Sequence, residues 1–195
     1  MRRHLSGSIV VAWMGMWLAG ASAAGAEEPK KAPEGPPECV VGEMRIQRLP
    51  GPTYFYTEME TTIPKTRKVV GEIMPVLLKT IGENNVHIAG PSIFVAVGAT
   101  GDPETPFKLS MGFSVAEGTK PAGDFKVKKL ADFRCATVLY SGPPAKVGEA
   151  YGKLFASLMA AGHQPTGETR EYCLYWESEK SPNNVMLIQA GIKEP

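Results

Sequence analysis

The apolar positions between residues 54 and 115 follow first the spacing of a strand and then that of a helix. Residues 54–62 are rich in aromatic and β-branched side chains and predict a strand. Pro64 then marks the start of a helix, because proline is favoured in the first helical turn. Behind it, apolar residues recur every three or four positions and form one helix face. The residues of this face are Val69, Val70, Ile73, Leu77 and Ile81.

Glycines and prolines set the predicted bounds around this helix. Gly82 is expected to terminate it. Pro75 is expected to kink or break it, because proline lacks the amide hydrogen that an interior helical position donates. Gly90-Pro91 predicts a turn. Residues 92–97 and 108–115 follow as two further strands.

The second half of the chain repeats this order of elements. Residues 133–140 predict a strand, and the prolines at positions 143 and 144 lie in the turn that starts a helix. Gly162 is the expected cap of that helix, and residues 169–176 and 185–192 predict two more strands. The same element order and glycine placement indicate a duplicated strand–helix–strand–strand unit. The apolar face of the second helix consists of Val147, Tyr151, Leu154, Phe155 and Leu158.

These elements predict an α+β fold. Strands joined by short turns pair antiparallel. Two amphipathic helices need one face of the joined sheet to cover their apolar stripes, and the other face is expected to stay partly open. Two such units side by side form a cleft, which is a common place for a ligand. We therefore expect tandem duplicated strand–helix–strand–strand units, an antiparallel sheet with two main helices on one face, and a cleft between the repeats.

The N-terminal region is typical of an exported protein. Residues 1–26 combine two arginines, a short apolar stretch and small residues that form A-x-A cleavage sites, as in a signal peptide. The apolar stretch is too short to span a bilayer, so we expect no stable membrane insertion after cleavage. Residues 27–38 are rich in Pro, Lys and Glu and predict a disordered linker. The domain is expected over residues 39–193, as two repeats of about 39–118 and 119–193, in the periplasm or outside the cell.

Composition narrows the possible partners. The formal net charge is +1 at pH 7, which gives no field that would recruit nucleic acid or an anionic membrane. We therefore expect no nucleic-acid partner. The sequence leaves the oligomeric state open.

Cysteine and histidine positions do not indicate a metal or redox centre. In an oxidising compartment, one pair among Cys39, Cys135 and Cys173 could bridge, or Cys135 and Cys173 could be separately buried thiols. These spacings match no zinc motif. His87 and His163 lie near predicted helix ends without a second ligand at suitable spacing. Together with the absence of a G-x-S-x-G motif, this predicts no metal, no cofactor and no catalytic residue.

A series of short motifs in the second repeat carries a family resemblance. The motifs are Tyr140-Ser141-Gly142-Pro143, Ala150-Tyr151, Leu154, Ala161-Gly162, Pro165-Thr166-Gly167 and Arg170-Glu171-Tyr172. In this order they resemble the GyrI-like effector-binding domain, which is also found in AraC- and MerR-type transcription regulators. The resemblance implies a tandem-repeat α+β fold that binds small, often cationic or aromatic, molecules between the repeats. No helix-turn-helix segment precedes these motifs, so the chain looks like a stand-alone binding version.

The chain departs from the family pattern at two places. The family signature is often Glu-x-Tyr, whereas this chain has Glu171-Tyr172-Cys173. Leu187 stands at or next to a position where the closing strand of the family often carries a glutamate. These departures leave open whether the ligand is cationic or neutral.

Glu171 is the strongest polar candidate for a binding site. A carboxylate in the middle of an apolar strand is costly unless it is paired or functional. The alternative is a surface glutamate that pairs with Arg170 or a lysine. Alternation places Glu171 and Tyr172 on opposite faces, but the sequence does not say which face packs under the helices. The remaining ligand-binding candidates are Tyr172, Tyr175, Tyr140, Tyr54, Met111 and Phe113.

The sequence therefore predicts an exported small-molecule-binding protein with an aromatic-lined cleft between two repeats, and not an enzyme. Two alternatives remain. One is a hydrolase of reactive small molecules that uses a cleft glutamate and tyrosine. The other is a protein-interaction module, which an apolar patch extending beyond the cleft would favour.

Overall fold

The computed structural model describes residues 39–194, so the predicted signal peptide and linker lie outside the described residues. The strands are β1 (Val40–Val41), β2 (Arg45–Leu49), β3 (Thr53–Thr61), β4 (Ile88–Val97), β5 (Phe107–Val115), β6 (Lys126–Lys129), β7 (Phe133–Ser141), β8 (Pro165–Tyr175) and β9 (Val185–Ile192). The helices are α1 (Ile63–Glu83) and α2 (Val147–Ala160), with a short 3₁₀ turn, η1 (Pro144–Lys146), before α2.

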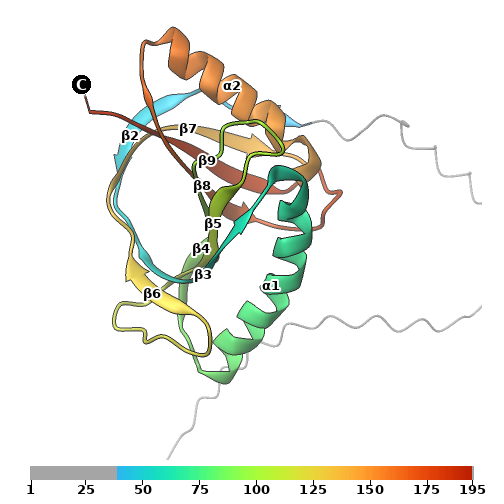
Figure 1. Ribbon diagram of the computed structural model, residues 1–195, viewed down its shortest axis with the longest axis vertical. Helices are drawn as coiled ribbons and strands as arrows, with labels where there is room; N and C mark the ends of the chain where they lie inside the picture. Colours follow the sequence, from blue (N-terminus) through green and yellow to red (C-terminus); the bar gives the residue numbers. More distant parts are fainter. Residues whose placement is uncertain (1–38, 195) are drawn as a thin grey trace, which may run out of the picture. The chain divides into compact units, whose positions relative to one another are not determined.

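All the strands belong to one antiparallel sheet, which confirms the predicted α+β class (Figure 1). Its order is β1-β7-β9-β8-β4-β5-β3-β6, with β2 also paired to β7. The order separates the two repeats, because β3-α1-β4-β5 occupies one half of the sheet and β7-α2-β8-β9 the other. The halves meet where β4 pairs antiparallel with β8.

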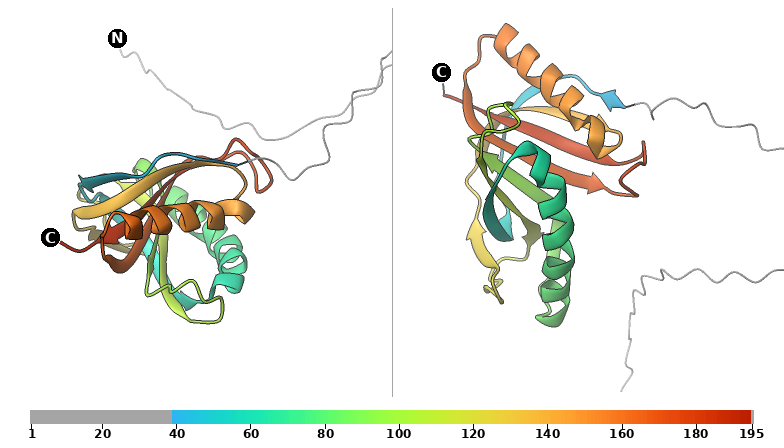
Figure 2. Two further views of the ribbon diagram at one scale, coloured as in Figure 1. Left: turned by 90° about the horizontal axis from the view of Figure 1, so that it is seen from above. Right: turned by 45° about the vertical axis from the view of Figure 1, so that its right-hand side comes forward.

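Both helices cover the same face of the sheet, as predicted (Figure 2). Helix α1 packs Leu77 and Ile81 against Phe55 of β3 and Val115 of β5. Helix α2 packs its apolar stripe on β7 and β9. A fully buried leucine such as Leu154 contributes roughly 1.5–3 kcal/mol, so these two cores hold the helices in place.

The opposite sheet face is enclosed over part of its area and stays open at Leu139, which is 51% exposed, so the prediction of a partly open face holds. The chain from β2 into β3 pairs with the chain from β6 into β7 in one continuous register, from Arg45–Thr137 to Tyr56–Lys126. This two-stranded ribbon links both ends of the sheet and closes it on itself (Figure 1). Inside the closure lies a third core cluster, made of Tyr54, Tyr56, Ile93, Val95 and Leu130, with Tyr172 packed against it.

Helix ends were predicted with mixed success. Gly162 caps α2 as expected: it has a φ of 75°, and the amide of His163 donates to the carbonyl of Leu158 at 3.1 Å. Helix α1 passes Gly82 and ends at Glu83, which makes the prediction for Gly82 wrong. Its left-handed cap residue is Asn85, with a φ of 52°. This cap lets Val86 reach the core beneath α1.

Two predicted interruptions are absent from the described elements. Helix α1 continues through Pro75. The hydrogen bond that proline cannot make would reach the carbonyl of Gly71, and both residues are exposed, so water can satisfy that carbonyl. Gly90-Pro91 lies inside β4 rather than in a turn, next to a register irregularity between Ile88 and Ser92. Proline is tolerated there because a bulge removes the need for its amide hydrogen.

The ribbon closure predicts a severe effect at Gly51. A Cβ atom at this buried position would lie 1.9 Å from the carbonyl oxygen of Leu130. Gly51→Ala is therefore expected to cost about 3 kcal/mol or more in the free energy of unfolding, measured by urea denaturation. Gly71→Ala is the control, because nothing beyond the adjacent backbone of its own helix lies within 4 Å of its Cβ site. That helical substitution should stabilise by about 1 kcal/mol. Equal effects at the two glycines would contradict the closure.

Candidate functional site

Glu171 lies at the junction of the two repeats, on the face that the helices cover. It is in the middle of β8, where its direct neighbours across the sheet are Phe94 of β4 and Ile188 of β9. Directly opposite residues in antiparallel strands share a face. Ile188 belongs to the core beneath α2, so Glu171 projects to the same side as the helices. The carboxylate therefore stands among apolar side chains and is only partly exposed.

Helix α2 supplies the polar partner of this carboxylate. The hydroxyl of Tyr151 donates a hydrogen bond of 2.6 Å to Oε1 of Glu171. Tyr151 also stacks on Phe155, one helical turn later, with ring centroids 6.3 Å apart and planes 18° from parallel. Both rings are partly buried at the edge of the apolar stripe of α2. One glutamate and two aromatic rings thus meet where α2 approaches the repeat junction.

Burial dominates the electrostatics of this pair. It raises the pKa of the Glu171 carboxyl, and the hydrogen bond from Tyr151 opposes the rise only in part. The pKa of the Tyr151 hydroxyl lies well above its ordinary value, first because of burial and then because of the Glu171 charge. Within residues 39–194, no lysine or arginine forms an ion pair with Glu171. The predicted alternative of a surface ion pair with Arg170 is wrong, since Arg170 lies on the other face and pairs with Glu168.

Apolar side chains continue from Glu171 across the first repeat. Phe94 of β4 opposes Met111 of β5, so both share the face of Glu171. Phe113 follows two residues after Met111 and points to the same side, packed against the core beneath α1. Met111 is fully buried, whereas Phe94 and Phe113 are partly exposed. This row makes an apolar floor next to the carboxylate.

The structure brings together only some of the predicted site residues. Glu171, Met111 and Phe113 share the helix-covered face. Tyr54 and Tyr172 lie on the opposite face, inside the ribbon closure, because each alternates with a residue that faces the helices. They therefore do not line a cleft that contains Glu171.

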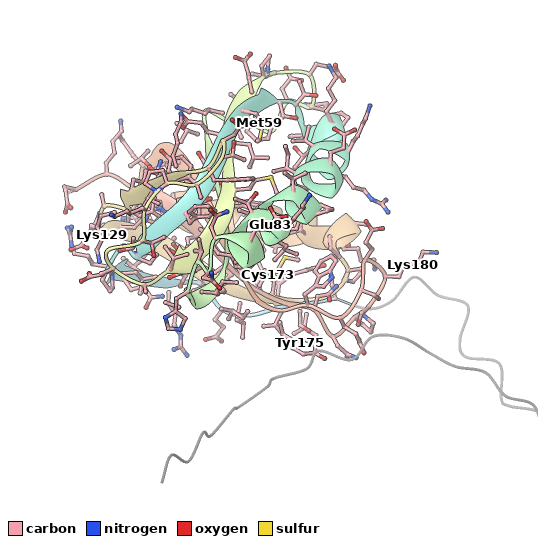
Figure 3. The ribbon with its side chains drawn as sticks, turned by 90° about the horizontal axis from the view of Figure 1, so that it is seen from below. Met59, Glu83, Lys129, Cys173, Tyr175 and Lys180 are labelled. Carbon is pink, nitrogen blue, oxygen red and sulfur yellow. The ribbon has the colours of Figure 1, made fainter. Side chains whose placement is uncertain are left out.

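The other two predicted tyrosines also lie away from Glu171. Tyr140 is fully buried beneath α2, and its hydroxyl donates to the carbonyl of Pro143 at 2.6 Å. Tyr175 is 54% exposed at the end of β8, at the margin of the domain (Figure 3). Tyr140 thus has a structural role in the turn before α2, and Tyr175 is a surface residue.

Tyr151 and Phe94 are the neighbours of Glu171 that sequence reasoning did not select. Tyr151 was counted as part of the helical apolar stripe, where its hydroxyl gave no separate signal. Phe94 lies in a continuous apolar run, SIFVAV, which hides the alternation of faces. The usable signal was the helical spacing of Tyr151 and Phe155, which indicates two aromatic rings on one helix edge.

Neither a disulfide nor a metal cluster accompanies this site. Cys39, Cys135 and Cys173 are all free thiols, Cys135 buried and Cys173 partly buried, so of the two alternatives the structure has separate thiols. Cys135 and Cys173 alternate onto opposite faces of the sheet. In the part of the chain that the structure describes, no group of histidines, cysteines and carboxylates is arranged to hold a metal ion. No helix within residues 39–194 is long and apolar enough to cross a membrane.

Two shallow hollows lie away from Glu171. One, of about 450 Å³, lies at the ends of β3, β4 and β5 and is lined by Glu58, Glu60 and Lys108, among others. The other, of about 370 Å³, follows the end of α1. The Glu171 site is therefore identified by its partly buried carboxylate and its aromatic neighbours rather than by a preformed cavity.

The raised pKa predicts how Glu171 affects stability. The pKa of Glu171 is higher in the folded than in the unfolded chain. Its contribution to the free energy of unfolding is therefore most favourable at pH values below the pKa of the unfolded chain, about 4.3. Its contribution is lost as the pH rises through the folded pKa. Glu171→Gln cannot ionise, and its amide oxygen can still accept the bond from Tyr151. The variant should therefore gain stability relative to wild type between pH 4 and pH 8, measured by thermal unfolding.

The control for this experiment is Glu60→Gln, which changes an exposed carboxylate on β3. It should not reproduce the pH-dependent gain. A stability difference between Glu171→Gln and wild type that is the same at both pH values would contradict the buried-carboxylate interpretation.

Comparisons with solved structures identify the fold. The C-terminal domain of EcmrR superimposes with a TM-score of 0.66 at 14% sequence identity, covering 78% of this chain and 98% of that domain. EcmrR in a DNA complex gives a TM-score of 0.67 at 15% identity, and there the match spans only 58% of the EcmrR chain. SAV2435, solved bound to tetraphenylphosphonium, gives 0.56 at 9% identity and covers 77% of this chain and 94% of that one.

A hydrolase from Listeria innocua has a TM-score of 0.50 at 8% identity, covering 76% of this chain and 92% of that one. No curated protein matches the sequence. Residues 42–192 match the family described as the GyrI-like small molecule binding domain. This match includes both repeats and the strands that join them. The chain therefore belongs to the GyrI-like small molecule binding domain family.

Proposed function

We propose that this protein is an exported binding protein that takes a small aromatic cation at the Glu171 site and does not transform it. The observation that carries the proposal is a partly buried carboxylate without a cationic partner among the described residues, set at the repeat junction beside aromatic rings. Burying such a group without a counter-charge costs stability, and carboxylates kept in this state cluster at functional sites. Binding is the function that this arrangement and the family membership both support.

The electrostatics favour a cation. An organic cation beside Glu171 would supply the missing counter-charge and lower the pKa of the carboxyl again. The rings of Phe94, Tyr151 and Phe155 would attract a desolvated cation through their faces. SAV2435, which shares the fold, was solved bound to tetraphenylphosphonium, and this makes the same compound a reasonable probe. A delocalised cation also loses less hydration energy on entering an apolar site than a compact ammonium.

The proposal is tested by isothermal titration of residues 27–195 with tetraphenylphosphonium at pH 8. Glu171→Gln is expected to weaken binding by a factor of ten to a hundred, about 1.4 to 2.8 kcal/mol. Triphenylphosphine oxide is an uncharged compound that carries phenyl rings on phosphorus, and its affinity should be the same for Glu171→Gln and wild type.

Glu60→Gln is the matched control and should bind like wild type. Undiminished binding of tetraphenylphosphonium to Glu171→Gln would contradict the proposed site. If Glu171→Gln binds the cation and the neutral compound more weakly by the same factor, the substitution has changed the shape of the site rather than removed a charge.

Hydrolysis of a reactive ring compound is the second candidate. The observation that favours it is the 2.6 Å bond between the Tyr151 hydroxyl and Glu171, since a carboxylate and a tyrosine could orient water and donate a proton. Under this alternative, Tyr151→Phe and Glu171→Gln both abolish turnover of an electrophilic ring substrate, followed by mass spectrometry. Under simple binding, wild type produces no hydrolysed product, and Tyr151→Phe changes the affinity for tetraphenylphosphonium only a few-fold.

Export is supported by the signal-peptide pattern of residues 1–26. Cleavage after Ala23 or Ala26 would leave Ala24 or Glu27 as the first residue of the mature protein. The mass of full-length protein recovered from the periplasm or medium should match one of these starts. Uncleaved protein confined to the cytoplasmic fraction would contradict export.

A further inference from the structure

The interior of the ribbon closure contains a second group of polar side chains, on the sheet face opposite Glu171. Lys128 of β6 opposes Tyr54 of β3 and so faces this interior rather than the outer edge. Its ammonium lies 4.3 Å from the centre of the Tyr56 ring, which in turn stacks on Tyr54 at 5.0 Å. Lys128 is partly buried, and desolvation lowers its pKa. The ammonium group of Lys128 thus lies over the stacked rings of Tyr56 and Tyr54, in the interior of the ribbon closure.

The cations around Lys128 have acidic partners. Lys108 and Lys126 both pair with Glu58, at 2.9 Å and 3.1 Å. Arg170 pairs with Glu168 at 2.7 Å. Within residues 39–194, no carboxylate oxygen lies within 4.0 Å of the Lys128 ammonium.

The charges that act on Lys128 come from three different strands, β3, β5 and β8. Glu58 and Glu168 raise its pKa, whereas Lys108 and Arg170 lower it. Glu58 is already shared by two lysines, and Glu168 is bonded to Arg170. The described residues therefore leave a positive group inside the closure whose neighbouring carboxylates are engaged elsewhere.

A second, independent observation comes from Gln189 of β9. This side chain is 1% exposed, and its Oε1 atom has no hydrogen-bond donor among the described residues. It stands directly across the strands from Arg170 on one side and Thr137 on the other, on the same interior face. A buried acceptor without a donor destabilises the folded chain, and a bound molecule can supply the missing donor.

Arg170 connects the two groups. It is 3% exposed, donates to the carbonyl of Ala131 at 3.1 Å and stacks on Phe133 at 3.9 Å. Arg170 stands next to Gln189 in the sheet, and Lys128 faces the same interior from β6. The interior face therefore carries both positive charge and a buried hydrogen-bond acceptor.

We propose that this interior face is a second binding site, for a small oxyanion that also carries a hydroxyl group. The oxyanion would form an ion pair with Lys128, and the positive charge of Arg170 on the same face would add to the attraction. The hydroxyl would donate a hydrogen bond to Oε1 of Gln189. Carboxylate and phosphate groups of small polar metabolites have this chemistry. The site is separate from Glu171, because the two lie on opposite faces of the sheet, and the proposal does not depend on the function assigned to Glu171.

The test uses inorganic phosphate, which at pH 7 carries both negative oxygens and a hydroxyl. The melting temperature of residues 27–195 is measured against phosphate concentration, with sodium chloride added to keep the ionic strength constant. Phosphate should raise the melting temperature of wild type in a saturable manner. Lys128→Gln should weaken the apparent affinity at least tenfold.

Lys129→Gln is the matched control, because Lys129 is the next residue of β6, lies on the other face and pairs with Glu117 at 3.0 Å. It should respond to phosphate like wild type. A phosphate effect that is absent from wild type, or equal in Lys128→Gln and Lys129→Gln, would overturn the proposal.

A second measurement does not depend on whether the variant folds. In wild-type protein labelled with ¹³C-lysine, phosphate should shift the Cε signal of Lys128 far more than that of Lys129. The two signals are assigned in uniformly ¹³C,¹⁵N-labelled wild-type protein from through-bond correlations, so no variant is needed. Uniform small shifts of all lysine signals would indicate general ionic effects and would also overturn the proposal.

Discussion

Antiparallel pairing between β4 and β8 is the contact on which the rest of this structure depends. The pairs run from Ser92–Cys173 to Val97–Glu168 and join one repeat to the other through backbone hydrogen bonds. Without it, each repeat would expose a long, largely apolar edge strand, which is a template for aggregation. With it, the two helices lie on one continuous face. The same pairing sets Glu171 opposite Phe94, so the candidate site exists only because the repeats are joined there.

The second structural constraint is the closure of the sheet by the ribbon from β2–β3 and β6–β7. It separates the molecule into two chemically different faces. On the helix-covered face, a lone carboxylate stands among apolar side chains. On the enclosed face, cations and a buried amide stand among tyrosines. Alternation along β8 contributes Glu171 to the first face and Arg170 to the second, and we propose a positive ligand for the first and a negative one for the second.

The repeated units were predictable because each core element carries its own periodic signal. The stripes of both helices and the apolar runs of six strands follow directly from residue spacing. Strands β2 and β6 were not predicted, since RIQRL and KVKK are short and mostly polar. They are strands because they pair with distant parts of the chain, and local sequence does not encode such partners. The enclosure of part of the second face was missed for the same reason.

The candidate site was predictable only in part. Glu171 was detectable as a carboxylate in an apolar strand, and alternation correctly separated it from Tyr172. The assignment of each set to a face needed the structure, which is why Tyr54 and Tyr172 were grouped with Glu171. Tyr151 was recognised as part of a helix but not as the polar partner of Glu171, because a hydrogen bond between side chains 20 residues apart leaves no sequence pattern.

The central claim is that Glu171 is a partly buried carboxylate available to a positive ligand. The most direct measurement is the pH titration of its side-chain carboxyl ¹³C signal by NMR, with and without saturating tetraphenylphosphonium. The account predicts that Glu171 titrates at higher pH than the other glutamates in the free protein, and that the bound cation moves this titration to lower pH. An ordinary titration midpoint that the cation does not change would contradict the claim.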